Sequence, residues 1–591
     1  MKWDLGKLYP GFDAPEFIRD MDAFEARANA VFEAVKAMAV DAGSLEGIIA
    51  DLQGLTALAV KTLSYAQLTL AADANCAPAM AALTRLKPLV NRLSEIHSAL
   101  SLRLAAAEDL EAMIAASALL REHAYFLRNL RREAAHVIDP ALEPVVLRMQ
   151  LTGGRAWEQL RDQLDANHTV TYTLNGEAAT LPLSAARGLA YSPDAEARRA
   201  AYEAELAAYP RMAIPMAACL NGIKGEALTL AELRHYDSVL NMALDTARMD
   251  RATLDALMAA MWESLPMFRR YFRLKARLLD YGGGLKFYDL FAPVGRMAAG
   301  YTPEDARAML TRELGTFSPR MARMIDRAFD ENWIDMYPRE GKTGGAFCEG
   351  VHPLGISYVL ANFEGSYSSV STLAHELGHA YQNECMREVS ILMSDYPMPL
   401  AETASIFNET LLAQRMLEGA DRDARIALLE QQIGDAAQVI VDILSRFLFE
   451  SEVIVRRKDS VLTPQALCDI MLDAQRQTYG DGLDPDCMHP YMWACKSHYY
   501  SPDVHFYNFP YAFGQLFAVG LYRLYRQRGA AFLPEYEKLL RDAGAGDVRQ
   551  VAAGVGIDVT DVGFWRGAIG FFEDMLGDLE ALTQSQSRPE G

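Results

Sequence analysis

Long apolar runs, cysteine pairs and positive charge are all scarce in this sequence. No segment reaches the roughly 18 apolar residues that a membrane-spanning helix needs, and the N-terminus lacks the basic start and apolar stretch of a signal peptide. The seven cysteines are scattered and odd in number, which argues against a disulfide framework and fits a reducing cytoplasm. We therefore expect a cytoplasmic protein with no membrane partner.

The charge balance excludes a further class of partner. The 57 Lys and Arg residues are outnumbered by 78 Asp and Glu, which gives a formal net charge of −21. A surface of this sign repels nucleic acid and anionic membranes. The 51% of hydrophobic and 23% of charged residues are ordinary for a soluble globular protein. The sequence does not predict an oligomeric state.

Helical periodicity dominates the chain. Apolar residues recur at a spacing of three to four along 15–42, 44–72 and 78–106, which predicts packed helices. One break, at 168–181, alternates on both sides of Asn175-Gly176 and predicts a β-hairpin. We expect three consecutive domains: a helical region at 1–110, a helical and hairpin domain at 111–190, and a catalytic domain at 191–591.

The most informative feature is the segment His375-Glu376-Leu377-Gly378-His379. On a helix, two histidines four residues apart lie on one face and can bind a single Zn²⁺ through nitrogen. The glutamate after the first histidine can then take a proton from a metal-activated water molecule. The motif predicts metal-assisted hydrolysis, most often of a peptide bond.

A catalytic zinc needs a third protein ligand. The segment 397–409 offers two carboxylates on one helix face, Glu402 and Glu409, after a pair of prolines that suit a helix start. One carboxylate can complete a His-His-Glu set. Glu409 can orient a histidine by accepting a hydrogen bond from the ring nitrogen that does not bind the metal. A second cluster of zinc-like residue types, Cys487, His489, Cys495 and His498, matches no common spacing for a zinc site.

Residues 355–363 form a strand-like segment before the expected zinc helix. Such a strand can pair with an extended substrate at a sheet edge, or it can be a buried core strand. The residues alone leave both interpretations open.

The motif and its surroundings resemble oligoendopeptidase F, of the thimet oligopeptidase-like zinc metallopeptidases. The similar segments are the zinc motif, Leu400–Ser405, 344–348, 361–365, 498–500 and 506–515. The resemblance implies a mainly α, two-lobed helical body with a small β-sheet beside the zinc helix and a deep substrate channel. It also implies that one Zn²⁺ per chain is bound by His375, His379 and Glu402.

The same resemblance implies roles for further residues. Glu376 is expected to be the general base, and a His and a Tyr from the downstream segment are expected to stabilise the oxyanion. His498 and Tyr511 align best with this pair, and His505 and Tyr507 are the other candidates. The expected function is internal cleavage of short, unfolded peptides.

Two other functions remain open. The first is a zinc carboxypeptidase or dipeptidyl carboxypeptidase with a similar motif, which a basic group for the substrate's C-terminal carboxylate would distinguish. The second is a helical binding protein with a vestigial motif, against which the intact Glu376 argues.

Overall fold

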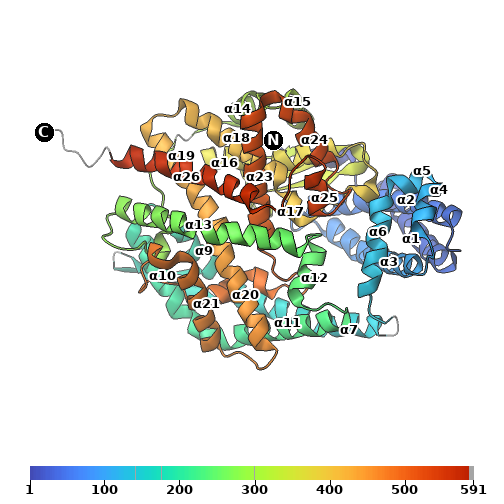
Figure 1. Cartoon of the computed structure of the whole chain (residues 1–591), viewed down its shortest axis with the longest axis horizontal. Coiled ribbons are helices and arrows are strands. Elements are labelled where there is room, and N and C mark those ends of the chain that lie inside the picture. Colours follow the sequence, from blue (N-terminus) through green and yellow to red (C-terminus); the bar gives the residue numbers. More distant parts are fainter. Residues whose placement is uncertain (140–141, 175, 298–299, 585–591) are drawn as a thin grey trace. The chain divides into compact units, whose positions relative to one another are not determined.

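A computed structural model describes residues 1–139, 142–174, 176–297 and 300–584 (Figure 1). It is 72% helical with only small sheets, so the prediction of a mainly α fold is confirmed. The chain forms two compact units, each assembled from three segments. Unit 1 comprises Met1–Val137, Ala298–Met416 and Leu524–Ile557, and unit 2 comprises Ile138–Met297, Leu417–Arg523 and Asp558–Gly591. These units are discontinuous in sequence, whereas the sequence analysis expects three consecutive domains. The three domains and the deep channel stay predictions.

Unit 1 contains these helices and strands: α1 (Pro15–Ala37), α2 (Ala42–Ala72), α3 (Ala77–Ala105), α4 (Leu110–Ala116), α5 (Ala118–Glu122), α6 (Ala124–Glu133), α14 (Pro303–Gly315), α15 (Pro319–Asp330), β3 (Ile334–Asp335), β4 (Phe347–Val351), β5 (Ile356–Leu360), α16 (Tyr367–Cys385), α17 (Met398–Ala401), most of α18 (Thr403–Gly419), α24 (Leu533–Arg541) and α25 (Val548–Ala553).

Unit 2 contains these: α7 (Glu143–Thr152), α8 (Gly154–Ala166), β1 (Thr169–Leu174), β2 (Glu177–Pro182), α9 (Leu183–Gly188), α10 (Ala195–Ala208), α11 (Ala213–Leu233), α12 (Val239–Thr246), α13 (Arg251–Leu278), α19 (Arg422–Ala437), a π-helical stretch (Gln438–Asp442), α20 (Ile443–Arg457), α21 (Pro464–Tyr479), α22 (Met492–Cys495), most of α23 (Phe509–Arg528) and α26 (Val562–Gln584).

The first three helices of unit 1 pack side by side, as the periodicity predicts (Figure 1). The first helix ends at Ala37 rather than at 42, because Asp41 caps the second one by accepting a hydrogen bond from the Ser44 amide. Helix α2 also contacts strand β4, where the Ser64 hydroxyl donates to Glu349 at 2.8 Å. The bundle therefore flanks the small sheet.

The sheet of unit 1 has the order β3-β5-β4. Strand β5 is central, since it pairs in parallel with β3 and antiparallel with β4, and Ser357–Leu360 are buried. The interpretation of 355–363 as an edge strand is therefore wrong, and the alternative of a core strand is right. The edges of the sheet are the two-residue strand β3 and the longer β4, and the second side of β4 pairs with no other strand of the described residues.

In unit 2 the predicted hairpin is present, with Thr169 opposite Pro182 and Leu174 opposite Glu177. Asn175, predicted to lie in the turn, is outside the described residues. Helix α26 packs along α13 (Figure 1). A buried ion pair between Lys224 and Glu450, 2.6 Å apart, joins α11 to α20.

Candidate metal centre

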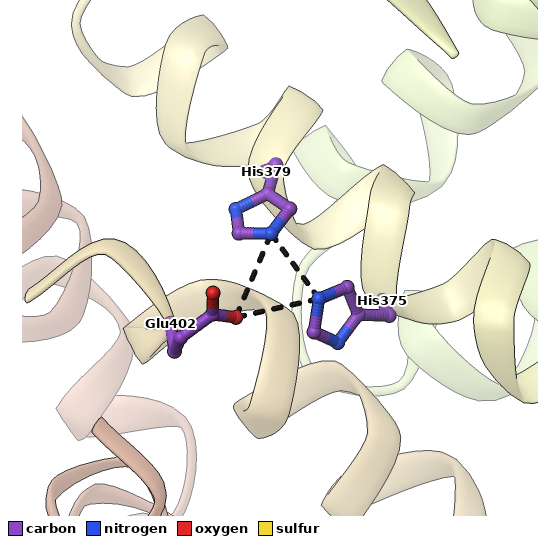
Figure 2. Close-up of side chains that lie close together, drawn as sticks. All are labelled: His375, His379 and Glu402. Carbon is purple, nitrogen blue, oxygen red and sulfur yellow. Dashed lines mark hydrogen bonds and ion pairs between the residues drawn. The ribbon is translucent and has the colours of Figure 1, made fainter. Parts of the chain in front are cut away.

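Helix α16 carries the two histidines of the motif. It begins after Ser366, whose hydroxyl accepts from the Ser369 amide. One turn apart, His375 and His379 bring their Nε2 atoms to 3.2 Å from each other (Figure 2). The Glu402 carboxylate lies 3.3 Å from Nε2 of His375 and 3.6 Å from Nε2 of His379. Among the described residues, this is the one group of three or more His, Cys, Asp or Glu side chains arranged to hold a metal.

A glycine inside the motif explains how the third residue reaches the histidines. A Cβ atom on Gly378 would lie 2.5 Å from Cα of Ser405 and 2.6 Å from the carbonyl oxygen of Ala404. The backbone of α18 therefore touches α16 where a side chain would keep it away. Glu402 does not lie within one continuous helix with Glu409, because it occupies the junction between α17 and α18. This junction points its carboxylate toward α16 (Figure 2).

The spacing of the three ligand atoms fits zinc. Donors held at about 2.0–2.1 Å around a tetrahedral ion lie about 3.3–3.4 Å apart, and the observed separations are 3.2, 3.3 and 3.6 Å. Two ring nitrogens and a carboxylate oxygen that converge in this way also need a cation or a proton between them. The donor set of two imidazoles and one carboxylate is one that catalytic zinc uses.

Further hydrogen bonds orient these three side chains. The Nδ1 atom of His375 lies 2.7 Å from Oε1 of Glu409, so its proton faces the carboxylate and Nε2 is left for a metal. The Ser405 hydroxyl donates to Oε2 of Glu402 at 2.8 Å. The Asn408 amide donates to the carbonyl of Ala374 at 3.2 Å and ties α18 to α16. The sequence indicated Glu409, whereas no sequence pattern indicated Ser405 or Asn408.

The site in its metal-free form favours positive charge at one histidine. Burial opposes protonation of His375, but the hydrogen bond to Glu409 and the nearby carboxylates outweigh it and raise the pKa of His375 to about 9. Burial, and then the charge of His375, lower the pKa of His379 to about 4. Burial raises the pKa of Glu376 to about 7, with Glu402 and Glu409 adding to the effect and His375 opposing it. The carboxylates around His375 therefore favour a cation at this site.

These residues open onto a cavity of about 660 Å³ within unit 1. One wall is the face of α16 that carries His375 and His379, continued past the helix end by Arg387, and another includes Thr56 and Val60 of α2. Between them lie Ala346–Val351, that is, strand β4 and the residue before it. Strand β4 and the metal centre therefore line the same cavity.

The expected downstream residues all lie in unit 2. The His498 ring stacks on Tyr507, with centroids 4.6 Å apart, and lies 6.3 Å from the Tyr511 ring. His498, Tyr507 and Tyr511 therefore form one cluster. His505 is 4% exposed, its Nδ1 lies 3.4 Å from Nζ of Lys224, and burial lowers its pKa well below the usual value. His505 therefore lies in a buried environment beside Lys224, apart from the stacked cluster of the other three residues.

The second candidate cluster does not assemble. His489 places Nε2 3.3 Å from Oε1 of Glu205, and His498 stacks on Tyr507 instead of approaching the cysteines. All seven cysteines are free thiols, as the scattered pattern predicts.

Comparison with known proteins places the chain in a family. A model of peptidase family M3 matches residues 188–571, and a model described as oligopeptidase F matches residues 104–169. The chain belongs to peptidase family M3. The chain is therefore a peptidase. Its resemblance to oligoendopeptidase F is confirmed by the match to the oligopeptidase F model.

Individual relatives agree with this assignment. The family M3 chain is 26% identical over 474 residues to group B oligopeptidase PepB of Streptococcus agalactiae, covering 78% of this chain and 77% of the relative. It is 26% identical over 477 residues to an oligoendopeptidase F homolog of Lactococcus lactis, covering 79% and 77%.

Solved structures show the same fold. A Chlamydophila abortus protein superposes with a TM-score of 0.83 at 23% identity, over 98% of each chain. Oligoendopeptidase-F of Enterococcus faecium superposes with a TM-score of 0.70 at 20% identity, over 96% of this chain and 99% of that one. No helix among the described residues is long and apolar enough to cross a membrane.

Proposed function

We propose that this chain is a zinc-dependent endopeptidase that hydrolyses internal peptide bonds of short, unfolded peptides. The observation that carries the proposal is the convergence of His375, His379 and Glu402 at separations suited to one tetrahedral zinc, beside a buried Glu376. Family membership supports the same class of reaction. A single such site predicts one zinc per chain.

A zinc ion held there would supply Lewis acidity and lower the pKa of a water molecule to about 7. Glu376 lines the same cavity and is 5% exposed. Its carboxylate takes the proton of the attacking water and passes it to the leaving amine, the role of a general base and then a general acid.

We assign the donors to the developing oxyanion to His498 and Tyr511, with Tyr507 and His505 as the alternatives. The assignment rests on the resemblance and on the stacked cluster that His498, Tyr507 and Tyr511 form. A hydrogen bond from a positioned imidazole or phenol stabilises negative charge that appears only as the carbonyl is attacked.

Access and backbone pairing are proposed to select the substrate. An extended segment can add to the free edge of β4 beside the metal centre. A folded protein must first unfold locally to offer such a segment, whereas a peptide of about six to twenty residues needs no unfolding. Membership of a peptidase family supports short peptides as partners. The net charge argues against nucleic acid and anionic membranes as partners, and the cysteine usage supports a cytoplasmic location.

Metal analysis combined with two substitutions tests the proposal. Purified protein should carry about one zinc per chain. Glu376→Gln should keep the zinc and lose at least about 10²-fold in kcat, because an amide cannot accept the proton. His379→Ala should lose zinc and activity together. Near-wild-type turnover by Glu376→Gln, or a metal content near zero in protein prepared without chelators, would contradict the proposal.

A further inference from the structure

The cavity at the metal centre also carries a cationic side chain. Arg387 lines the same space as the zinc ligands, and it is the one Lys or Arg among the described lining residues. Its guanidinium forms no hydrogen bond or ion pair with another described residue. An exposed cation that faces a substrate cavity without a carboxylate of its own can accept one from a ligand.

A turn of the chain holds Arg387 in place. Gly355 has a left-handed φ of 59°, and a Cβ atom there would lie 2.7 Å from Nε of Arg387. The guanidinium therefore rests on the backbone of this glycine. The Gly355 amide donates to the carbonyl of His352 at 3.0 Å, which puts His352 in the same turn.

His352 adds a second polar group at this turn. It lines the cavity, and its Nε2 atom is buried with no hydrogen-bond partner. A buried ring nitrogen without a partner costs free energy that a ligand can recover. In one tautomer this nitrogen donates a hydrogen bond, as a carboxylate requires.

The acidic groups nearby do not neutralise Arg387. Glu384 lies in the last turn of α16, three residues before Arg387, but it is already placed between Arg327 at 3.3 Å and Arg320 at 3.7 Å. Glu349 accepts a hydrogen bond from Ser64 and points toward α2. Asp395 also lines the cavity and takes part in an interaction of its own.

We propose that Arg387 and His352 form a subsite for a substrate carboxylate, three or four residues from the cleaved bond. The six residues from His379 to Cys385 rise about 9 Å along α16, and Arg387 follows two residues after the helix ends. An extended peptide covers about 9 Å in about three residues, at about 3.3 Å each, so Arg387 is placed beside the third or fourth residue. The inference rests on the proposed peptidase function, because the cleaved bond is placed at His375, His379 and Glu402.

The direction of the peptide decides which carboxylate is bound. Strand β4 runs from Cys348, near Glu376, toward the turn that contains His352. A substrate antiparallel to β4 brings an acidic side chain on the N-terminal side of the cleaved bond to Arg387. A parallel substrate brings residues from the C-terminal side, either an acidic side chain or the free α-carboxylate. In both arrangements the group that reaches Arg387 is a carboxylate.

A matched peptide series tests the subsite. Fluorogenic ten-residue peptides carry Glu or Gln at the third or fourth position on either side of the cleaved bond, and one further pair ends in a carboxylate or an amide. The zinc-loaded wild type should cleave one carboxylate peptide with a kcat/KM about five- to twentyfold above that of its neutral twin. Raising the ionic strength should shrink this ratio, since the guanidinium is exposed.

Substitutions then assign the preference to the residue. Arg387→Gln should abolish the preference and leave cleavage of the Gln peptides unchanged, and Arg387→Glu should favour a Lys peptide. Arg323→Gln removes an exposed arginine of the same unit that does not line the cavity, and it should keep the wild-type ratio. Equal cleavage of every pair by the wild type, or a preference retained by Arg387→Gln, would overturn the subsite alone. Failure to cleave any peptide would overturn the proposed function and the subsite with it.

Discussion

Glu409 offers a sharp test of how the metal centre is held. Its Oε1 atom lies 2.7 Å from Nδ1 of His375, a distance typical of a charge-assisted hydrogen bond. Removing such a partner of a metal-binding histidine usually costs about 10- to 100-fold in metal affinity. The Glu409 side chain is 33% exposed, so water can replace part of the lost contact. We therefore expect a loss near the lower limit, about tenfold, for Glu409→Ala.

Glu409→Gln should have a smaller effect, about threefold, because its amide oxygen still accepts the Nδ1 proton while the negative charge is gone. Competition with a chromogenic chelator at neutral pH gives the zinc dissociation constant of each variant. Glu364→Gln, an exposed carboxylate of the same unit, is the matched control and should bind zinc like the wild type. A zinc affinity of Glu409→Ala within twofold of the wild type would refute the orienting role.

Two further substitutions have predictable outcomes. Changing His498 to Ala or Tyr511 to Phe should lower kcat roughly 10²–10³-fold with little change in KM, because a donor to the oxyanion acts in the transition state; small, equal effects at both would transfer the role to Tyr507 or His505. Gly378→Ala should reduce both zinc content and thermal stability, because its Cβ would lie 2.5 Å from Cα of Ser405 and force α18 away from α16; a variant with full zinc content and an unchanged Tm would contradict that reading of the helix contact.

Local patterns predicted much of the fold. The spacing of apolar residues predicted the three N-terminal helices to within a few residues, and the alternation around 168–181 predicted the hairpin. Strand order was not predictable, since β5 and β4 are both short and partly apolar. Only the pairing of β5 on both sides shows that β4 lies at an edge of the sheet.

The metal centre was predictable to a similar degree. The spacing of His375 and His379 is a property of one helix, so the sequence alone placed them together. Glu402 required the resemblance, because its approach depends on the contact between Gly378 and Ser405 of another helix. The environment of Arg387 was not predictable, because it depends on a turn at Gly355 that is 32 residues earlier in the chain.

Mass spectrometry of the products from a mixed peptide library tests the central claim most directly. Zinc-loaded wild type should cut unstructured peptides at internal bonds, Glu376→Gln should leave them intact although it retains zinc, and a stably folded protein should survive in both samples. Stepwise loss of terminal residues or dipeptides would reassign the chain to the exopeptidases. Equal product spectra from the wild type and Glu376→Gln would contradict the claim that His375, Glu376, His379 and Glu402 form a zinc peptidase centre.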